Sequence, residues 1–412
     1  MIEIYSYGYS IPYLLFLLYY VVLMFLEFRY MKYEKDTKVI HWAAILGFVL
    51  FVGFRGFIYT DWLMYYPLFD ELPTIWDGGV ISVWNMDFSD KFVTDVSVGQ
   101  TGVEMGFIYF TVLFKSIIPD YYSWIVFNTL LDILLISVFL KRYNKYYILA
   151  FICYLVFGGL IVEVNLMRNI KAILLFLISI KYLEERRIIP YFALNLLGLT
   201  FHNTAIIFLP LYFFLHKNAP KWLMWTIFIV GNIIFIMQIE YLKPILLSVA
   251  ERMGGMTEVK VKVYFASELY SHRLGLGLEF FEHNIMFLLI LLLKNKLLEQ
   301  NPRNVIFINA YLLYFIFYFF FSEIMVAVER LTLLLIFSHW ILIPEIFGLL
   351  KNSIQKIAFL VILIPYCFFK MTMMNSTVFA RYDNVIFGIE SFDERSTKVS
   401  NQLEHVLNPN QN

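Results

Sequence analysis

The sequence contains few charged residues, few cysteines and no local metal-binding motif. Charged residues make up 16% of the 412 residues, whereas about a quarter are charged in an average soluble domain. Cys153 and Cys367 are the only cysteines, and both lie in apolar runs, which argues against a disulfide framework and a thiolate metal site. His-x-x-x-His and Glu-x-x-His pairs do not occur, so we expect no metal and no cofactor. The 32 basic and 32 acidic residues balance, and net charge predicts no nucleic-acid partner.

Apolar residues make up 60% of the chain, and its mean hydropathy is +0.71. A membrane-spanning helix needs about 20 mostly apolar residues. Because no basic segment precedes a small-residue cleavage site, the first apolar run is expected to remain as a transmembrane helix. The candidate spans are 11–28, 39–56, 121–140, 146–163, 169–183, 221–238, 281–298, 304–322, 329–349 and 354–372.

These runs predict an all-α polytopic integral membrane protein with about 11–13 transmembrane helices, some of them short or re-entrant. Residues 1–375 would form a single transmembrane domain. Residues 376–412 form a polar C-terminal tail, and its last stretch is expected to be disordered.

Lysine and arginine are concentrated in short loops, which predict the orientation across the membrane. The 29–38 loop is basic and is assigned to the cytoplasm, whereas residues 57–103 contain many acidic residues against the lone Lys91 and are assigned outside. If the chain changes sides at each span so that every basic loop stays in the cytoplasm, residues 239–280 form a second extracytoplasmic loop. Further basic turns assigned to the cytoplasm lie at 141–145, 186–187, 217–221, 294–303 and 351–356.

Keeping every basic loop in the cytoplasm also limits how two apolar segments can cross the membrane. Residues 104–118 are too short to cross and must dip in and return, or lie at the interface. Residues 188–215 as one helix would measure about 42 Å, which is too long for a core of about 30 Å. We therefore expect two short crossings joined near His202.

Charged side chains interrupt the apolar helices in five places, and each is a functional hypothesis because burying a charge in a membrane is costly. The loop-charge topology places all five at the extracytoplasmic face. They are Arg55 with Asp61; Glu104; Glu163 with Arg168 and Lys171; His202; and Glu329 with Arg330.

Structural explanations remain open for each of these residues. Arg55 and Arg330 could extend their side chains to lipid headgroups, and His202 could be a hydrogen-bonded core residue. Asp61 could cap a helix, and Glu163 and Arg168 could form a simple ion pair. The aromatic side chains of Trp62, Tyr65 and Tyr66 could stack on sugars or belong to an interfacial belt.

Taken together, the charges suit a polyanion with a reacting hydroxyl nearby. Arginine binds phosphate oxygens in a bidentate manner and keeps its charge, which fits Arg55, Arg168 and Arg330. A carboxylate or a histidine can accept the proton of an attacking hydroxyl.

Several short motifs follow one another in order along residues 50–345. They are Phe54-Arg55 with Asp61 and Tyr65 or Tyr66; Glu104-Met105-Gly106-Phe107; Arg168, the Glu184–Arg187 turn, Phe201-His202 and Leu209-Pro210; and Glu329-Arg330-Leu331 with Ile341–Pro344. This ordered set resembles the EpsG-type branch of the Wzy-like bacterial polysaccharide polymerases. Two departures are Tyr59-Thr60-Asp61 where the family often has Gly-Thr-Asp, and Arg168-Asn169 where it often has Arg-Gln.

The resemblance implies a multi-pass protein of the bacterial inner membrane, and a GT-C-like architecture is suspected. Its substrate would be undecaprenyl-pyrophosphate-linked oligosaccharide, joined into polymer at the outer face without a metal. Membrane lipids and a chain-length regulator protein are the other expected partners.

The resemblance also suggests roles for the charged and aromatic residues. Arg168, Arg330 and Arg55, with Lys171 nearby, would bind the pyrophosphate. Candidate bases are Asp61, His202, Glu104 and Glu163; Asp61 is favoured because it lies in the first outer loop. Trp62, Tyr65 and Tyr66 would bind sugar.

Three other functions are compatible with the sequence. A ligase would move finished glycan onto another acceptor with the same leaving group. A transporter of lipid-linked oligosaccharide would need charges along a path at the membrane midplane, whereas these gather at one face. A structural partner of a synthase would use the charges only as anchors.

Overall fold

The computed structural model describes residues 5–77, 103–255, 258–259, 262, 265 and 273–407. Within these ranges the secondary structure is helical, apart from isolated bridges. The predicted all-α fold class is therefore confirmed. Parts of the predicted outer loops 57–103 and 239–280, and the last residues of the tail, lie outside the described residues.

Four helices of the described ranges are long and apolar enough to cross a membrane, and a bent pair supplies a fifth. The four are α1 (Tyr7–Lys32), α6 (Tyr121–Tyr143), α7 with α8 (Tyr147–Asn165) and α20 (Ser353–Met374). The bent pair consists of α18 (Met325–Leu333) and α19 (Phe337–Leu349), with a bend of 55°. These helices make the chain a polytopic membrane protein.

Further helices fill the rest of the bundle, and most of them are shorter. They are α2 with η1 (Lys38–Gly53), α9 (Met167–Glu184), α10 (Ile188–Phe201), α12 (Lys221–Ile236), α16 (Leu278–Gln300) and α17 (Asn304–Phe320). The sequence-based count of about 11–13 crossings includes such helices and stays a prediction.

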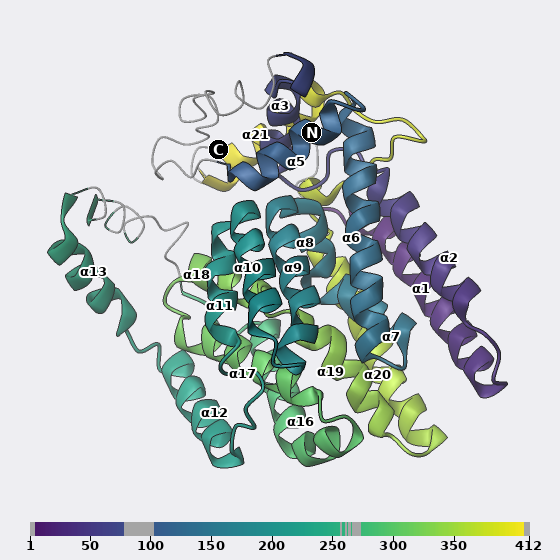
Figure 1. Cartoon of the computed structure of the whole chain (residues 1–412), viewed down its shortest axis with the longest axis vertical. Coiled ribbons are helices and arrows are strands. Elements are labelled where there is room, and N and C mark those ends of the chain that lie inside the picture. Colours follow the sequence, from purple (N-terminus) through teal and green to yellow (C-terminus); the bar gives the residue numbers. More distant parts are fainter. Residues whose placement is uncertain are drawn as a thin grey trace.

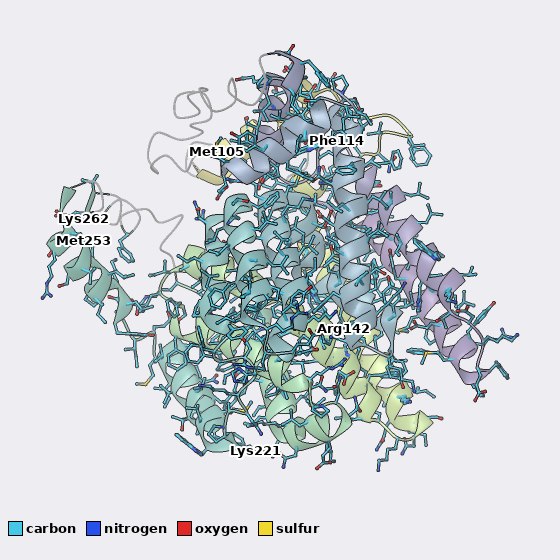
Figure 2. All side chains as sticks on the ribbon, viewed as in Figure 1. Met105, Phe114, Arg142, Lys221, Met253 and Lys262 are labelled. Atoms are coloured by element: carbon cyan, nitrogen blue, oxygen red, sulfur yellow. The ribbon has the colours of Figure 1, made fainter. Side chains whose placement is uncertain are left out.

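One end of the bundle is covered by three helices that lie across it, and we call it the capped end (Figure 1). They are α3 (Trp62–Glu71), α5 (Met105–Lys115) and α21 (Phe392–Leu407). With 11 residues, α5 is too short to span a membrane, as the sequence predicted. Arg142 and Lys221, from two of the basic turns, lie toward the opposite end (Figure 2).

Residues 188–215 break at His202, the position expected from the sequence. Helix α10 ends there, and the chain returns through the 3-10 helix η4 (Asn203–Ile207) and the short α11 (Phe208–Leu211). The Tyr191 hydroxyl donates to the Phe208 carbonyl at 2.6 Å, which ties the two legs together. Helix α10 contacts α5, and the Asn203 backbone N–H donates to Glu104, so the turn after α10 lies at the capped end.

The centre of the bundle is formed by α7, in which every side chain is buried. It ends in the π-helical η3 (Leu155–Gly159), where Gly158 adopts a φ of +79°. A Cβ atom at Gly158 would lie 3.0 Å from Ile336 Cγ1, so glycine also permits close approach of the α18–α19 bend. The Phe157 carbonyl, freed by the kink, accepts a hydrogen bond from Trp340 Nε1 at 2.9 Å.

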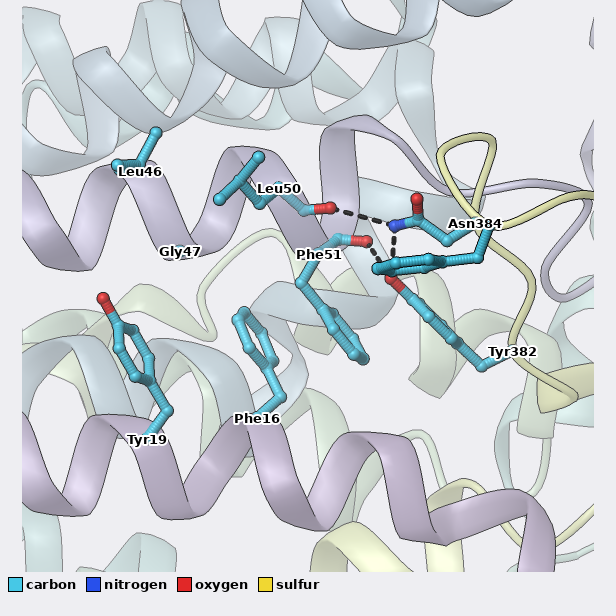
Figure 3. A pocket seen from close by; sticks show the side chains of 9 residues that line it. Phe16, Tyr19, Leu46, Gly47, Leu50, Phe51, Tyr382 and Asn384 are labelled. Atoms are coloured by element: carbon cyan, nitrogen blue, oxygen red, sulfur yellow. Dashed lines mark hydrogen bonds between the residues drawn. The ribbon is translucent and has the colours of Figure 1, made fainter.

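The polar segment after residue 375 folds back over the capped end. Arg395 of α21 is fully buried and donates to the carbonyls of Phe57 and Arg381 at 3.2 and 2.8 Å. Tyr382 and Asn384 donate to carbonyls at the end of α2–η1 and close one side of an apolar groove against α1 (Figure 3). None of the described residues that line this groove is charged.

Candidate functional site

Asp61 is held at the start of α3 through its backbone. The Asn165 side-chain Oδ1, at the end of α8, accepts hydrogen bonds from the backbone N–H groups of Thr60 and Asp61 at 3.1 and 2.9 Å. Tyr59, two residues earlier, has a φ of +63°, which turns the chain from η1 into α3. Asn165 therefore ties the predicted first outer loop to the helix that continues α7.

The Asp61 side chain is half-buried, and its carboxylate makes no hydrogen bond to any residue that the structure describes. Burial raises the pKa of Asp61 to about 7, although Arg168 and Arg330 act in the opposite direction. A carboxyl group with a pKa near neutrality is partly ionised at neutral pH, and its ionised form accepts a proton effectively.

Arg168, in the first turn of α9, is held by Glu104. The Glu104 Oε2 lies 2.6 Å from Arg168 Nη1, and Glu104 Oε1 accepts the backbone N–H of Asn203 at 3.1 Å. The Arg168 Nε is buried and has no hydrogen-bond partner among the described residues. Since buried donors are normally paired, this N–H is a strong candidate for binding a ligand oxygen.

Gly106 explains how Glu104 reaches both partners. A Cβ atom at Gly106 would lie 2.2 Å from Thr200 Oγ1 and 2.6 Å from the Thr200 carbonyl oxygen. Only glycine allows α5 to approach the end of α10 this closely. The Glu-x-Gly motif therefore places Glu104 over the His202 turn.

The backbone of Thr204 favours one tautomer of His202. His202 Nδ1 lies 2.7 Å from Thr204 Oγ1 and 3.2 Å from the Thr204 backbone N–H, which can only donate, so the backbone contact favours a neutral ring with its proton on Nε2. Burial lowers the pKa of His202 to about 4; Glu104 opposes this, while Arg168 and Arg330 add to it. His202 can therefore donate a hydrogen bond through Nε2 and is poorly suited to accept a proton there.

Arg330, on α18, is exposed. Its charge acts on both Asp61 and His202, which places it at the same site. Of the larger group expected to converge, Asp61, Glu104, Arg168, His202 and Arg330 lie together, whereas Arg55, Glu163 and Lys171 do not join them.

Arg55, Glu163 and Lys171 lie in a deeper buried network. Lys171 pairs with Asp132 of α6, with nitrogen–oxygen distances of 2.5 and 2.7 Å, and the two side chains are 6% and 2% exposed. Arg55 donates to Thr129 Oγ1 at 3.1 Å, while Glu163 lies 3.4 Å from the Tyr154 hydroxyl. These residues are already partnered, which favours a positioning role.

The three predicted sugar-binding aromatics are packed. Trp62 and Tyr65 are 5% and 2% exposed, and Tyr66 stacks on Phe392 of α21 with ring centroids 4.8 Å apart. Tyr65 lies beside Arg168. Their arrangement favours a role in fixing α3, and sugar binding stays a prediction.

Sequence reasoning missed Asp132, and it missed the contact by which Asn165, noted beside Glu163 and Arg168, holds Thr60 and Asp61. Asp132 could have been found, because it is an acidic residue within the predicted span 121–140 and so met the rule applied to the other charges. Asn165 carried no such signal, since its contact with Thr60 and Asp61 joins residues about a hundred positions apart.

A protein-family model described as the EpsG family matches residues 38–384. The chain belongs to the EpsG family. This confirms the family expected from the ordered motifs, and every charged residue of the site lies within the matched range. No curated protein and no solved structure matches the chain. Family membership implies a polysaccharide polymerase-like role in a membrane, with a lipid-linked oligosaccharide as substrate.

Proposed function

We propose that this EpsG protein joins oligosaccharide units carried on undecaprenyl pyrophosphate into a polysaccharide. The reaction would take place at the capped end, which would face outward from the bacterial inner membrane. The observation that carries the proposal is the juxtaposition of Asp61, a base with a pKa near neutrality, with two arginines and a neutral histidine N–H.

The reaction needs a base and a stabilised leaving group. A hydroxyl of the acceptor sugar attacks the anomeric carbon of the donor glycan, and its proton passes to Asp61. The bond between the anomeric carbon and the pyrophosphate oxygen breaks, and undecaprenyl pyrophosphate leaves with the electron pair. The new glycosidic bond lengthens the chain by one unit.

Arg168 is the best-placed group for the leaving pyrophosphate. Its Nη1 is fixed by Glu104, and its buried Nε lacks a protein partner among the described residues. Arg330 is exposed and can approach a second phosphate oxygen, and His202 can donate through Nε2. Preorganised donors of this kind can stabilise developing negative charge without a metal in the reaction step.

The protonation states favour Asp61 over His202 as the base. In the tautomer that the Thr204 backbone favours, His202 carries its ring proton on Nε2, and burial lowers its pKa to about 4, so Nε2 is a hydrogen-bond donor and not a proton acceptor. Glu104 is engaged by Arg168 and Asn203, and Glu163 lies in the deeper network. Asp61 alone among the four carries a half-buried carboxylate with no hydrogen bond in the described structure.

The deciding experiment measures the length and leaflet of lipid-linked glycan in a deletion strain, complemented with wild type or Asp61→Asn. A polymerase defect leaves single repeat units on the carrier in the outer leaflet, and we expect both the deletion and Asp61→Asn to do so. Long chains retained on the carrier would indicate a ligase. Single units trapped in the inner leaflet would indicate a transporter, and either result would exclude the proposal.

A further inference from the structure

A second buried polar cluster lies away from the proposed reaction site. It contains Glu282 and His283 of α16, His339 of α19, and Lys370 with Tyr366 of α20. His283 and His339 are 2% and 0% exposed. No local sequence motif indicates the cluster, since the rest of α16, all of α17 and all of α18 separate His283 from His339.

Two imidazole nitrogens in this cluster are buried without a hydrogen-bond partner among the described residues. They are His283 Nδ1 and His339 Nε2. His339 Nδ1 lies 3.3 Å from the Ile336 carbonyl, which can only accept, so Nδ1 carries the proton and Nε2 presents a lone pair. A histidine fixed by an Nδ1–H bond to a backbone carbonyl is the arrangement that orients a metal ligand.

His283 can adopt the complementary tautomer. Its Nε2 lies 3.1 Å from the Tyr314 hydroxyl, and a proton on Nε2 donated to Tyr314 leaves a lone pair on Nδ1. The nearest carboxylate oxygen to Nδ1 is Glu282 Oε1, at 3.8 Å. Lys370 and Tyr366 both bind the other oxygen, Oε2, and so leave Oε1 directed at the histidines.

We propose that Glu282, His283 and His339 form a site for a divalent transition-metal ion of the Zn²⁺ type. One ligand atom from each of the three lies within 4.8 Å of the others. In a tetrahedral site with metal–ligand bonds of about 2.0–2.2 Å the ligand atoms lie about 3.3–3.6 Å apart, so these atoms need to approach one another by at most about 1.5 Å. Two imidazoles and one carboxylate favour Zn²⁺ over Mg²⁺ or Ca²⁺, which prefer oxygen ligands alone.

The ion would be structural. It would join α16 to α19, close to the bend that separates α19 from α18, the helix of Arg330. None of its three ligands belongs to the group of residues proposed to react. Lys370 provides a sharp test because its positive charge on Glu282 opposes metal binding. Without a metal, removing Lys370 would leave the buried Glu282 carboxylate without a positively charged partner. With a metal, removing Lys370 would strengthen the interaction between Glu282 and the ion.

The experiment measures metal content by mass spectrometry and thermal unfolding of the full chain, purified in detergent through a tag that binds no metal. We expect about one Zn²⁺ per chain, a lower Tm after chelation and recovery on adding Zn²⁺. His283→Gln and His339→Gln should weaken Zn²⁺ binding by ~100-fold or more, whereas His216→Gln, outside the cluster, should not.

Lys370→Met should bind Zn²⁺ more tightly than wild type and lose its thermal stability only after chelation. If Lys370→Met does not fold, the wild-type measurement alone decides. Wild-type protein without bound metal, whose Tm responds neither to the chelator nor to added Zn²⁺, would overturn the proposal. Equal retention of Zn²⁺ by His283→Gln, His339→Gln and His216→Gln would overturn it as well.

Discussion

Glu104 holds Arg168 in an ion pair of 2.6 Å while its second carboxylate oxygen accepts the backbone N–H of Asn203. One side chain from α5 thus connects the start of α9 with the turn after α10. The arginine is fixed at one nitrogen and left with a buried, unpartnered Nε at another. This geometry preorganises a hydrogen-bond donor, and a substitution of Arg168 can test whether that donor is needed.

Replacement of Arg168 by Lys keeps the charge but removes the planar set of donors. We expect Arg168→Lys to reduce the rate of chain elongation by about 10²–10³-fold, the usual effect of losing one donor to a developing negative charge. The measurement is glycan length in a complemented deletion strain. Arg142→Lys, whose partner Glu184 lies away from the capped end, is the matched control and should elongate normally.

Asp61→Asn tests the base. Loss of a general base should slow elongation by about 10²–10⁴-fold, and the wild-type rate should rise with pH through about 7 as Asp61 ionises. Asp70→Asn changes an exposed carboxyl group of the same helix and should retain the wild-type rate and pH profile. An Asp61→Asn protein with a normal rate would exclude Asp61 as the base.

The stability of Asp61→Asn should move in the opposite direction to its activity. The folded-state pKa of Asp61 is raised, so its contribution to stability is present below about pH 4 and is lost as the pH rises through about 7. The Tm difference between Asp61→Asn and wild type should therefore widen in favour of the variant from pH 4 to pH 8. That result also shows that the variant is folded.

His202→Asn separates a hydrogen-bond donor from a base. If His202 donates through Nε2, the variant should elongate about 10²-fold more slowly and keep the rise of rate near pH 7. The measurement is the pH dependence of elongation in reconstituted protein. Disappearance of the rise near pH 7 would assign the base to His202 and contradict the role of Asp61.

The sequence predicted the helical class, the family, the break at His202 and the charged residues that converge. It did so because charges inside apolar runs are rare and because loop charges constrain which of them share a face. It could not predict which charges are already paired. Lys171, expected to bind pyrophosphate, is bound to Asp132, and that pairing depends on the relative rotation of α6 and α9.

The C-terminal segment illustrates a second limit of sequence reasoning. Its polar composition predicts a tail, yet Arg395 is buried beneath backbone carbonyls of residues 57, 378 and 381. A local pattern cannot show this, because an arginine on an amphipathic helix usually points to water. One of these carbonyls belongs to Phe57 in the predicted first outer loop, more than three hundred residues earlier.

Gly106→Ala tests whether close packing of α5 positions the site. The added methyl would overlap Thr200, and overpacking of this kind costs about 1–3 kcal/mol of unfolding free energy. Because the displaced Glu104 would release Arg168, elongation should fall more than stability alone explains. Gly275→Ala, where an added Cβ meets nothing within 4 Å, is the control for both measurements.

The buried pair of Asp132 and Lys171 distinguishes a structural lysine from a pyrophosphate ligand. Asp132→Asn leaves Lys171 as an unpaired buried charge and should cost ~3–5 kcal/mol of unfolding free energy. The double variant Asp132→Asn with Lys171→Met removes both charges and should recover most of that loss, because the apolar methionine stem needs no partner.

Elongation by the same variants provides the second measurement. If Lys171 only positions α9 against α6, the double variant should elongate at a rate close to wild type once its stability is restored. If Lys171 binds pyrophosphate, the double variant should be stable and should still fail to elongate.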